Sequence, residues 1–183
     1  MKKNNKLAAS WGELSRLRTI TSMAMLMALS LVLNIFANID ITDSLRLGFS
    51  FLATAMMGML FGPVPAAIGA ALVDVAQAII KPTGPFFPGF TLTALLTGLV
   101  FGLFLYREKV TVWRLLLSRL VTNLLLNVVL NSIWLKILYD KAFWAMLPAR
   151  IIKNVAMLPV EVLLMYLILP NVRKILQKSK LYS

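Results

Sequence analysis

The stretch "LPARIIKNVAMLPVEVLLMYLILP", Leu147 to Pro170, is long and apolar enough to cross a lipid bilayer as a helix. It nevertheless carries four strongly polar side chains, which are Arg150, Lys153, Asn154 and Glu161. A charged side chain at the centre of a bilayer costs about 2.5–3.5 kcal/mol, even on the scale taken from insertion experiments. Such residues face the interior of a helical bundle or a water-filled cavity. The stretch therefore predicts a transmembrane helix with a functional face.

The spacing of these residues brings them onto one side of the helix. With Arg150 as the origin, Asn154 lies at about +40°, Glu161 at about +20° and Lys153 at about −60°. They share this face over about 16 Å of helix, whereas Pro159 lies on the far side. A single polar stripe of this kind indicates a polar site inside the protein.

The composition of the whole chain agrees with a membrane protein. Of its 183 residues, 60% are hydrophobic and 14% are charged, and the mean hydropathy is +0.83. The formal charge of +12 comes from basic residues near the chain ends and between apolar segments, which are topology signals rather than a nucleic-acid surface. Cysteine and histidine are absent, so disulfides, thiolate chemistry, histidine-ligated metals and Ser-His catalysis are excluded.

Six segments are apolar enough for membrane helices, and they predict an all-α membrane protein with one domain over residues 1–183. They run approximately over Leu17–Ala37, Leu47–Phe61, Ala66–Ile80, Pro88–Tyr106, Trp113–Leu138 and Met146–Leu169. The turn "FGPVPAA" joins the second segment tightly to the third, because proline and glycine end one helix and can begin the next.

The distribution of lysine and arginine predicts the orientation of the chain. Three groups of basic residues fall on one side if there are six spans: Lys2, Lys3, Lys6, Arg16 and Arg18; Arg107, Lys109 and Arg114; Arg173, Lys174, Lys178 and Lys180. The other side carries Arg46, Lys81, Lys136 and Lys141 among Asp40, Asp43 and Asp140. Cytoplasmic loops are enriched in Lys and Arg, so both termini are predicted to be cytoplasmic.

Two further segments carry polar faces. On the fifth, Arg119, Asn123, Asn127 and Asn131 recur every four residues, and Trp134 returns to the same side. For Arg119 and Asn123 we favour a structural role in interhelical hydrogen bonding. The alternative for Arg119 is that its side chain snorkels to the membrane surface. For Asn127, Asn131 and Trp134, together with the polar residues of the last segment, we favour a polar ligand site. The third segment adds Asp74, Gln77 and Lys81 within about 60° of arc.

The predicted outer loops offer aromatic and charged groups. The stretch "KPTGPFFPGFTLT", residues 81–93, contains Phe87 and Phe90 and is either a cap that stacks on a planar ligand or an interfacial aromatic belt. The loop "NIDITDSLRLG" carries Arg46 and two carboxylates, and is either a lid or a solvated connector. In the first segment, Ala24 and Ala28 form a small-xxx-small pattern that permits close approach of another helix, or serves internal packing.

Several catalytic motifs are missing from the sequence. It has no G-x-x-x-x-G-K-[ST] loop, so the chain is not expected to hydrolyse ATP itself. It has no HExxH motif and no aspartate-rich spacing that would hold Mg²⁺. We therefore expect no catalytic residues, no metal and no enzymatic activity. A pair of broken helices in inverted repeats is also not visible, which argues against a self-sufficient secondary transporter.

The chain resembles the substrate-binding S-components of energy-coupling factor (ECF) vitamin importers. The Ala24-x-x-x-Ala28 pattern and "LFGPVPAAIGAALVDVAQAI" are similar to general features of that family. The stretches "GPFFPGFTLTALLTGLVFGLFL", "LVTNLLLNVVLNSIWL" and "PARIIKNVAMLPVEVLL" look like the folate-specific member. The resemblance extends over nearly the whole chain.

This resemblance implies a binding protein in the plasma membrane of a bacterium, with no cofactor of its own. It would capture folate on the outer side and associate, through Ala24 and Ala28, with a transmembrane coupling subunit and two ATPases. Glu161 or Asn127 would then bind the pterin, while Arg150 and Lys153, with Lys136 or Arg46 as further candidates, would hold the glutamate tail. The reverse orientation of the ligand stays open. A structural pairing of Glu161 with Arg119 stays open, as do another vitamin ligand and a membrane enzyme or assembly factor.

Overall fold

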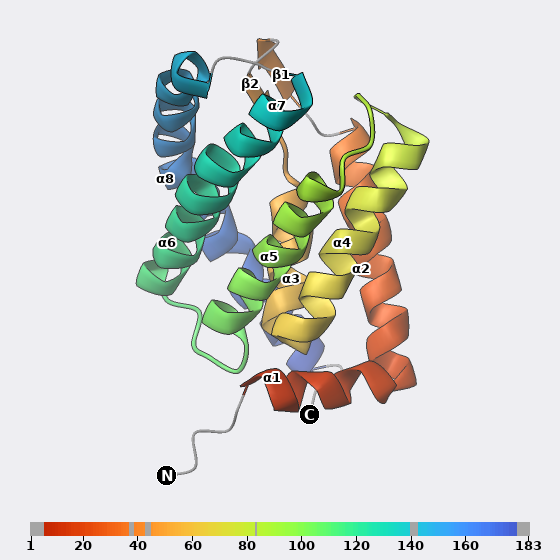
Figure 1. Ribbon diagram of the computed structural model, residues 1–183. Helices are drawn as coiled ribbons and strands as arrows, with labels where there is room; N and C mark the ends of the chain where they lie inside the picture. Colours follow the sequence, from red (N-terminus) through yellow and green to blue (C-terminus); the bar gives the residue numbers. More distant parts are fainter. Residues whose placement is uncertain (1–5, 37–38, 43–44, 83, 140–142, 179–183) are drawn as a thin grey trace.

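The computed structural model describes residues 6–36, 39–42, 45–82, 84–139 and 143–178, and these are almost entirely helical. The elements are α1 (Lys6–Trp11), the 3-10 helix η1 (Gly12–Ser15), α2 (Leu17–Phe36), β1 (Ile39–Thr42), β2 (Leu45–Leu47), α3 (Ser50–Phe61), α4 (Pro63–Ile80), α5 (Pro88–Leu105), α6 (Val112–Val121), the π-helical segment η2 (Thr122–Leu130), α7 (Asn131–Tyr139) and α8 (Phe143–Lys178). The long helices run side by side, and the antiparallel β1–β2 hairpin lies at one end of the bundle (Figure 1). The predicted all-α membrane fold is thus confirmed, with a small hairpin that the sequence did not predict.

The six predicted segments each correspond to a helix or a run of continuous helices. In the described part of the chain, five are long and apolar enough to cross a membrane: Leu17–Phe36, Pro63–Ile80, Pro88–Leu105, Val112–Leu138 and Arg150–Ile175. The sixth, α3, has 12 residues, which is about 18 Å of helix and less than a hydrocarbon core of about 30 Å. Every residue from 52 to 61 is buried, so α3 is a central helix that its neighbours surround. The number of spans stays a prediction.

The turn between α3 and α4 forms for the reason that the sequence indicated. Gly62 has φ +94°, a left-handed conformation that glycine adopts without strain, and Pro63 begins the next helix. Helix α5 packs closely against this turn, because a Cβ atom on Gly102 would collide with the backbone of Pro63. The close contact of α3, α4 and α5 makes the rigid part of the bundle against which the other helices pack.

The two C-terminal runs of helix differ from regular α-helices. The run from Val112 to Tyr139 changes to π-helix over Thr122–Leu130 and returns to α-helix at Asn131. The wider π turn rotates less per residue, so side chains four residues apart come closer into line than they would in an α-helix. Helix α8 has 36 residues and contains three prolines. Pro159 is exposed, on the far side from the polar stripe, as the helical geometry predicted.

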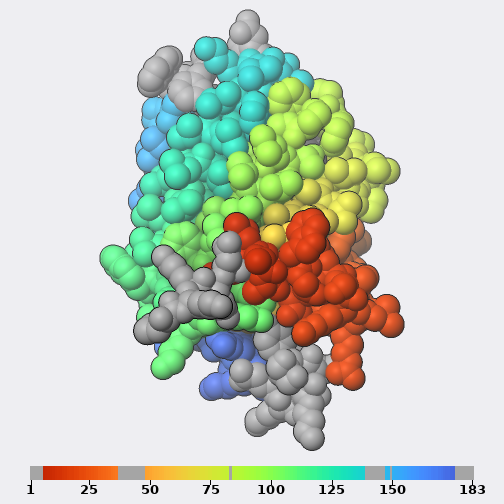
Figure 2. All heavy atoms as spheres, turned by 60° about the horizontal axis from the view of Figure 1, so that its bottom comes forward, coloured from red at the N-terminus to blue at the C-terminus, as the bar shows by residue number. Residues whose placement is uncertain are grey.

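Helix α1 lies across the end of the bundle opposite the hairpin (Figure 1), beside the loop between α5 and α6 (Figure 2). Glu108 in that loop joins three segments. Its carboxylate pairs with Lys6 at 3.0 Å and with Arg114 at 2.7 Å, and its carbonyl oxygen accepts a hydrogen bond from Arg173 at 2.6 Å. The hydrogen bond from Lys6 is the main cause of a lowered pKa of the Glu108 carboxyl. Described members of all three predicted cytoplasmic groups thus meet at one end.

This arrangement leads to a topology prediction. We expect a single cysteine at position 109, beside Glu108, to react with an impermeant thiol reagent only from the cytoplasmic side. A cysteine at position 140, which lies outside the described residues, should react from the outer side. The natural chain contains no cysteine, so the labelling has no background. Labelling of position 140 from the inside alone would contradict the predicted orientation.

Candidate functional site

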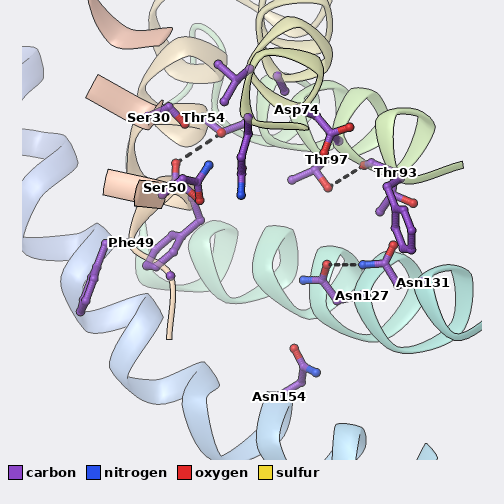
Figure 3. Close-up of a pocket in the computed structure, with 18 of the residues that line it drawn as sticks. Ser30, Phe49, Ser50, Thr54, Asp74, Thr93, Thr97, Asn127, Asn131 and Asn154 are labelled. Carbon is purple, nitrogen blue, oxygen red and sulfur yellow. Dashed lines mark hydrogen bonds between the residues drawn. The ribbon is translucent and has the colours of Figure 1, made fainter. Parts of the chain in front are cut away.

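A cavity of about 680 Å³ occupies the half of the bundle that faces the hairpin. Its walls come from the second halves of α2 and α4, the first half of α5, the start of α3, the end of α6, and parts of η2, α7 and α8. Ten of the residues predicted to bind a ligand line it: Asp74, Gln77, Phe87, Phe90, Asn127, Asn131, Arg150, Lys153, Asn154 and Glu161. Figure 3 shows Asp74 on one side of this cavity, with Asn127 and Asn131 between it and Asn154. The structure therefore brings together the polar faces of three separate helices.

The remaining two predicted residues, Trp134 and Arg46, are not among the described residues that line the cavity. Trp134 is one turn beyond Asn131, and its ring packs against Phe87 with centroids 5.7 Å apart. Its indole N–H donates to the Thr93 hydroxyl at 3.1 Å. It therefore supports the wall of the cavity from behind. Arg46 lies in β2 and pairs across the hairpin with Asp40, but its side chain is outside the described part of the structure.

Phe87, Phe90 and Trp134 form an aromatic cluster at the start of α5. The Phe87 and Phe90 rings meet edge to face, with centroids 6.0 Å apart. Phe87 and Phe90 also line the cavity, so the stretch 81–93 presents aromatic rings to it. This placement favours the interpretation as a cap over a planar ligand rather than as an interfacial belt alone.

The floor of the cavity is a buried ion pair between α6 and α8. Arg119 is only 4% exposed, and its guanidinium binds Glu161 through two nitrogens, with Nε 3.0 Å from Oε2. The same guanidinium lies 4.1 Å from the centre of the Phe51 ring. Asn123 donates to Glu161 Oε2 at 2.7 Å. The pairing of Glu161 with Arg119, which the sequence left open, is therefore observed. Arg119 and Asn123 make the interhelical hydrogen bonds that we favoured, and Arg119 does not snorkel.

Arg119 does not snorkel because it lies too deep in the bundle. Snorkelling needs a basic residue near the membrane surface, whereas Arg119 is enclosed by α3, α5 and α8. A buried guanidinium without a carboxylate would be very costly, and Glu161 supplies the compensating charge together with good bidentate geometry. Glu161 is therefore engaged within the protein and is not a free carboxylate for a ligand.

Arg150 is held much more loosely than Arg119. Its Nη1 lies 3.4 Å from the carbonyl oxygen of Asn127 and 3.4 Å from the Ser132 hydroxyl. No carboxylate among the described residues forms a salt bridge with it. Asn154 donates to the carbonyl oxygen of Arg150 at 2.8 Å, within the same helix. Arg150 is thus a cation at the cavity wall that can form stronger bonds with an anion.

The cavity lining carries more positive than negative charge. Among the described residues, four basic side chains line it, Lys81, Arg119, Arg150 and Lys153, against two carboxylates, Asp74 and Glu161. Glu161 is already neutralised by Arg119, and Asp74 accepts a hydrogen bond from Thr91 at 2.7 Å. Such a cavity favours a ligand that is anionic in one part and planar in another.

Several lining residues were not predicted. Phe49 directly precedes α3, Phe51 and Thr54 lie at its start, and Thr93 and Thr97 come from α5. Ser30 and Asn34 come from α2, where their spacing of four residues was a signal that could have been used. The α3 residues had no such signal, because that helix is apolar on all sides and its buried faces cannot be distinguished by periodicity.

Comparison with known proteins identifies the family. A family model described as the substrate-specific component of ECF transporters matches residues 18–169. The chain belongs to this S-component family. The family consists of transporter components rather than enzymes, in agreement with the missing catalytic motifs.

Relatives of this S-component share most of its length. The folate transporter FolT of Clostridium novyi is 37% identical over 153 residues, which cover 84% of this chain and 88% of that protein. FolT of Leuconostoc mesenteroides is 35% identical over 161 residues, covering 84% and 85%. A crystal structure of FolT bound with folic acid matches with a TM-score of 0.76 and 34% identity, covering 82% of this chain and 92% of that one.

Proposed function

We propose that this S-component binds folate from the outer side of a bacterial plasma membrane and delivers it for ATP-driven import. The observation that carries the proposal is the cavity, which combines an aromatic cluster with Arg150 and Lys153 in a chain 34% identical to a FolT solved with folic acid. Folate is a planar pterin joined to a tail with two carboxylates. Aromatic rings stack on the former, and basic side chains bind the latter.

The energy for import would come from partner proteins. The sequence contains no phosphate-binding loop, so ATP would be hydrolysed by two ATPase subunits joined to a transmembrane coupling subunit. Ala24 and Ala28 on α2 would provide the contact with that coupling subunit. Both are exposed in the structure, and therefore available to a partner rather than used in internal packing.

The test is a titration of the purified protein, and it includes a prediction for Arg150. Wild type should bind folate, and its absorption spectrum after purification should show a bound pterin. Replacing Arg150 by Ala removes a charge-assisted pair usually worth about 1.5–3 kcal/mol, so affinity for folate should fall roughly 10- to 150-fold. Stability in detergent should change little, because Arg150 has only long hydrogen bonds to the other described residues.

The control ligand is pteroate, which lacks the glutamate tail and its two carboxylates. It should bind wild type and Arg150→Ala almost equally. A variant that loses pteroate as strongly as folate would show that Arg150 does not bind the tail. Tighter binding of pantothenate or thiamine than of folate by the wild type would reject folate as the ligand.

A further inference from the structure

Three asparagines on one side of η2 and α7 form a chain of hydrogen bonds that we call the asparagine ladder: Asn123, Asn127 and Asn131. Asn131 Nδ2 donates to Asn127 Oδ1 at 3.5 Å, and Asn127 Nδ2 donates to Asn123 Oδ1 at 3.3 Å. Asn123 Nδ2 then donates to Glu161 Oε2 at 2.7 Å. Figure 3 shows the bond between Asn127 and Asn131 at the cavity wall. The π-helical turn keeps these side chains in line.

The carboxylate at the inner end decides the direction of the whole ladder. An ionised carboxylate only accepts hydrogen bonds, so Asn123 must turn its NH₂ group toward Glu161 and its oxygen toward Asn127. Asn127 must then present its own NH₂ to Asn123, and Asn131 must do the same to Asn127. Each amide is therefore oriented by its ladder neighbour on the side of Glu161. In an isolated amide, the oxygen and the NH₂ group could be exchanged.

The outer end of the ladder carries an oxygen that has no hydrogen-bond partner among the described residues. This atom is Asn131 Oδ1, and it is buried. The ladder is tightest beside the carboxylate and loosest at Asn131, as expected if the charge at Glu161 strengthens only its nearest bond. A buried acceptor without a donor is unfavourable, and Asn131 belongs to the cavity lining.

We propose that Arg119 and Glu161 are positioning residues that fix the direction of the asparagine ladder, so that Asn131 offers a ligand a hydrogen-bond acceptor. Arg119 also neutralises the negative charge of Glu161. Glu161 can therefore orient the ladder without repelling an anionic ligand in the cavity. Asn123 is 1% exposed and is not among the described residues that line the cavity. It acts on the ligand only through Asn127 and Asn131.

This inference rests on the proposed folate binding and specifies the orientation of the ligand. The donor edge of a pterin consists of its 2-amino group and a ring N–H, which match an acceptor at Asn131. The aromatic cluster lies on the same side, since Trp134 is one turn from Asn131 and packs on Phe87. The tail carboxylates would then bind Arg150 and Lys153 on α8. In this arrangement the pterin is recognised by the amide oxygen of Asn131, and not by Glu161 or Asn127, the two residues that the resemblance suggested.

The experiment compares folate with the analogue in which a methyl group replaces the 2-amino group. The two ligands carry the same tail charges, so the ratio of their dissociation constants isolates the donor edge. Wild type should prefer folate by roughly 10- to 100-fold. Asn131→Leu removes the acceptor and should reduce the ratio to about one. If Asn131→Leu keeps the wild-type ratio, Asn131 is not the acceptor.

The positioning role is tested at Asn123, outside the cavity. Asn123→Leu leaves the Arg119–Glu161 pair in place and should reduce the preference for folate severalfold. Asn171→Leu is the control, because Asn171 is exposed and, within the described part of the chain, donates only to the carbonyl oxygen of Leu167 in its own helix. It should keep the wild-type ratio. An unchanged ratio in Asn123→Leu would overturn the positioning role.

A measurement without ligand separates this inference from the proposed function. In protein labelled with ¹⁵N at asparagine, Asn123→Leu should shift the side-chain amide signals of Asn131, two steps along the ladder, and leave those of Asn171 in place. If the Asn131 signals are unchanged in Asn123→Leu, the proposed coupling along the asparagine ladder is wrong. A wild-type protein that shows the coupled signals but binds no folate would reject the proposed function alone.

Discussion

Replacing Ala28 by Trp is expected to abolish folate uptake by cells that also produce the coupling subunit and the ATPases, while folate binding to the isolated protein is retained. Ala24 and Ala28 are one turn apart, about 6 Å along α2, and both are exposed. The buried residues of this helix, Thr19, Met23 and Ser30, are on its other side. Small residues in a membrane allow two helices to approach closely, and an indole ring prevents that approach.

The matched control is Leu29→Trp. Leu29 is next in sequence and is 40% exposed, but it is rotated by about 100° from Ala28 around the helix axis. A tryptophan there should be tolerated in the lipid, so uptake should continue. Loss of folate binding in Ala28→Trp would indicate a packing role for the alanine face. Normal uptake would show that this face contacts only lipid.

The fold was largely predictable because its signals are local. Apolar length and helix-breaking residues such as Gly62 and Pro63 determine where membrane helices begin and end, and these signals need no knowledge of the neighbours. Helix α1 escaped prediction, since six residues between basic groups are too short for a membrane span. Its position depends on tertiary contacts, including the pair between Lys6 and Glu108.

The candidate site was predictable as a set of residues but not as a set of interactions. Helical periodicity placed Asn127, Arg150 and Glu161 on inward faces, and the structure puts all three at one cavity. Periodicity does not show which residues of different helices meet, so the pairing of Glu161 with Arg119 remained one alternative among several. The π-helical segment has no sequence signature of its own, and the direction of the amides follows only from that pairing.

Breaking the ion pair between Arg119 and Glu161 is expected to cause a large loss of stability. Glu161→Ala leaves a guanidinium that is 4% exposed without its carboxylate. Removing one partner of a buried pair costs about 3–5 kcal/mol, chiefly because the other charge stays buried and uncompensated. For a chain of this length, that corresponds to a fall in melting temperature of roughly 6–20 °C, measured by thermal unfolding in detergent. Arg119→Ala should have an effect of similar size.

Two further variants show whether the charge itself is responsible. Arg114→Ala removes a partner of Glu108 from a pair whose side chains are 40% and 31% exposed, and exposed pairs contribute at most about 1 kcal/mol. It should therefore unfold close to the wild type. The double variant Arg119→Met, Glu161→Leu replaces the buried pair by apolar side chains and should recover most of the lost stability, because no charge is left buried alone.

If the double variant is as unstable as Glu161→Ala, the loss comes from packing. If it is stable, it should still discriminate poorly between folate and the 2-methyl analogue, since Asn123 then has no carboxylate to orient it.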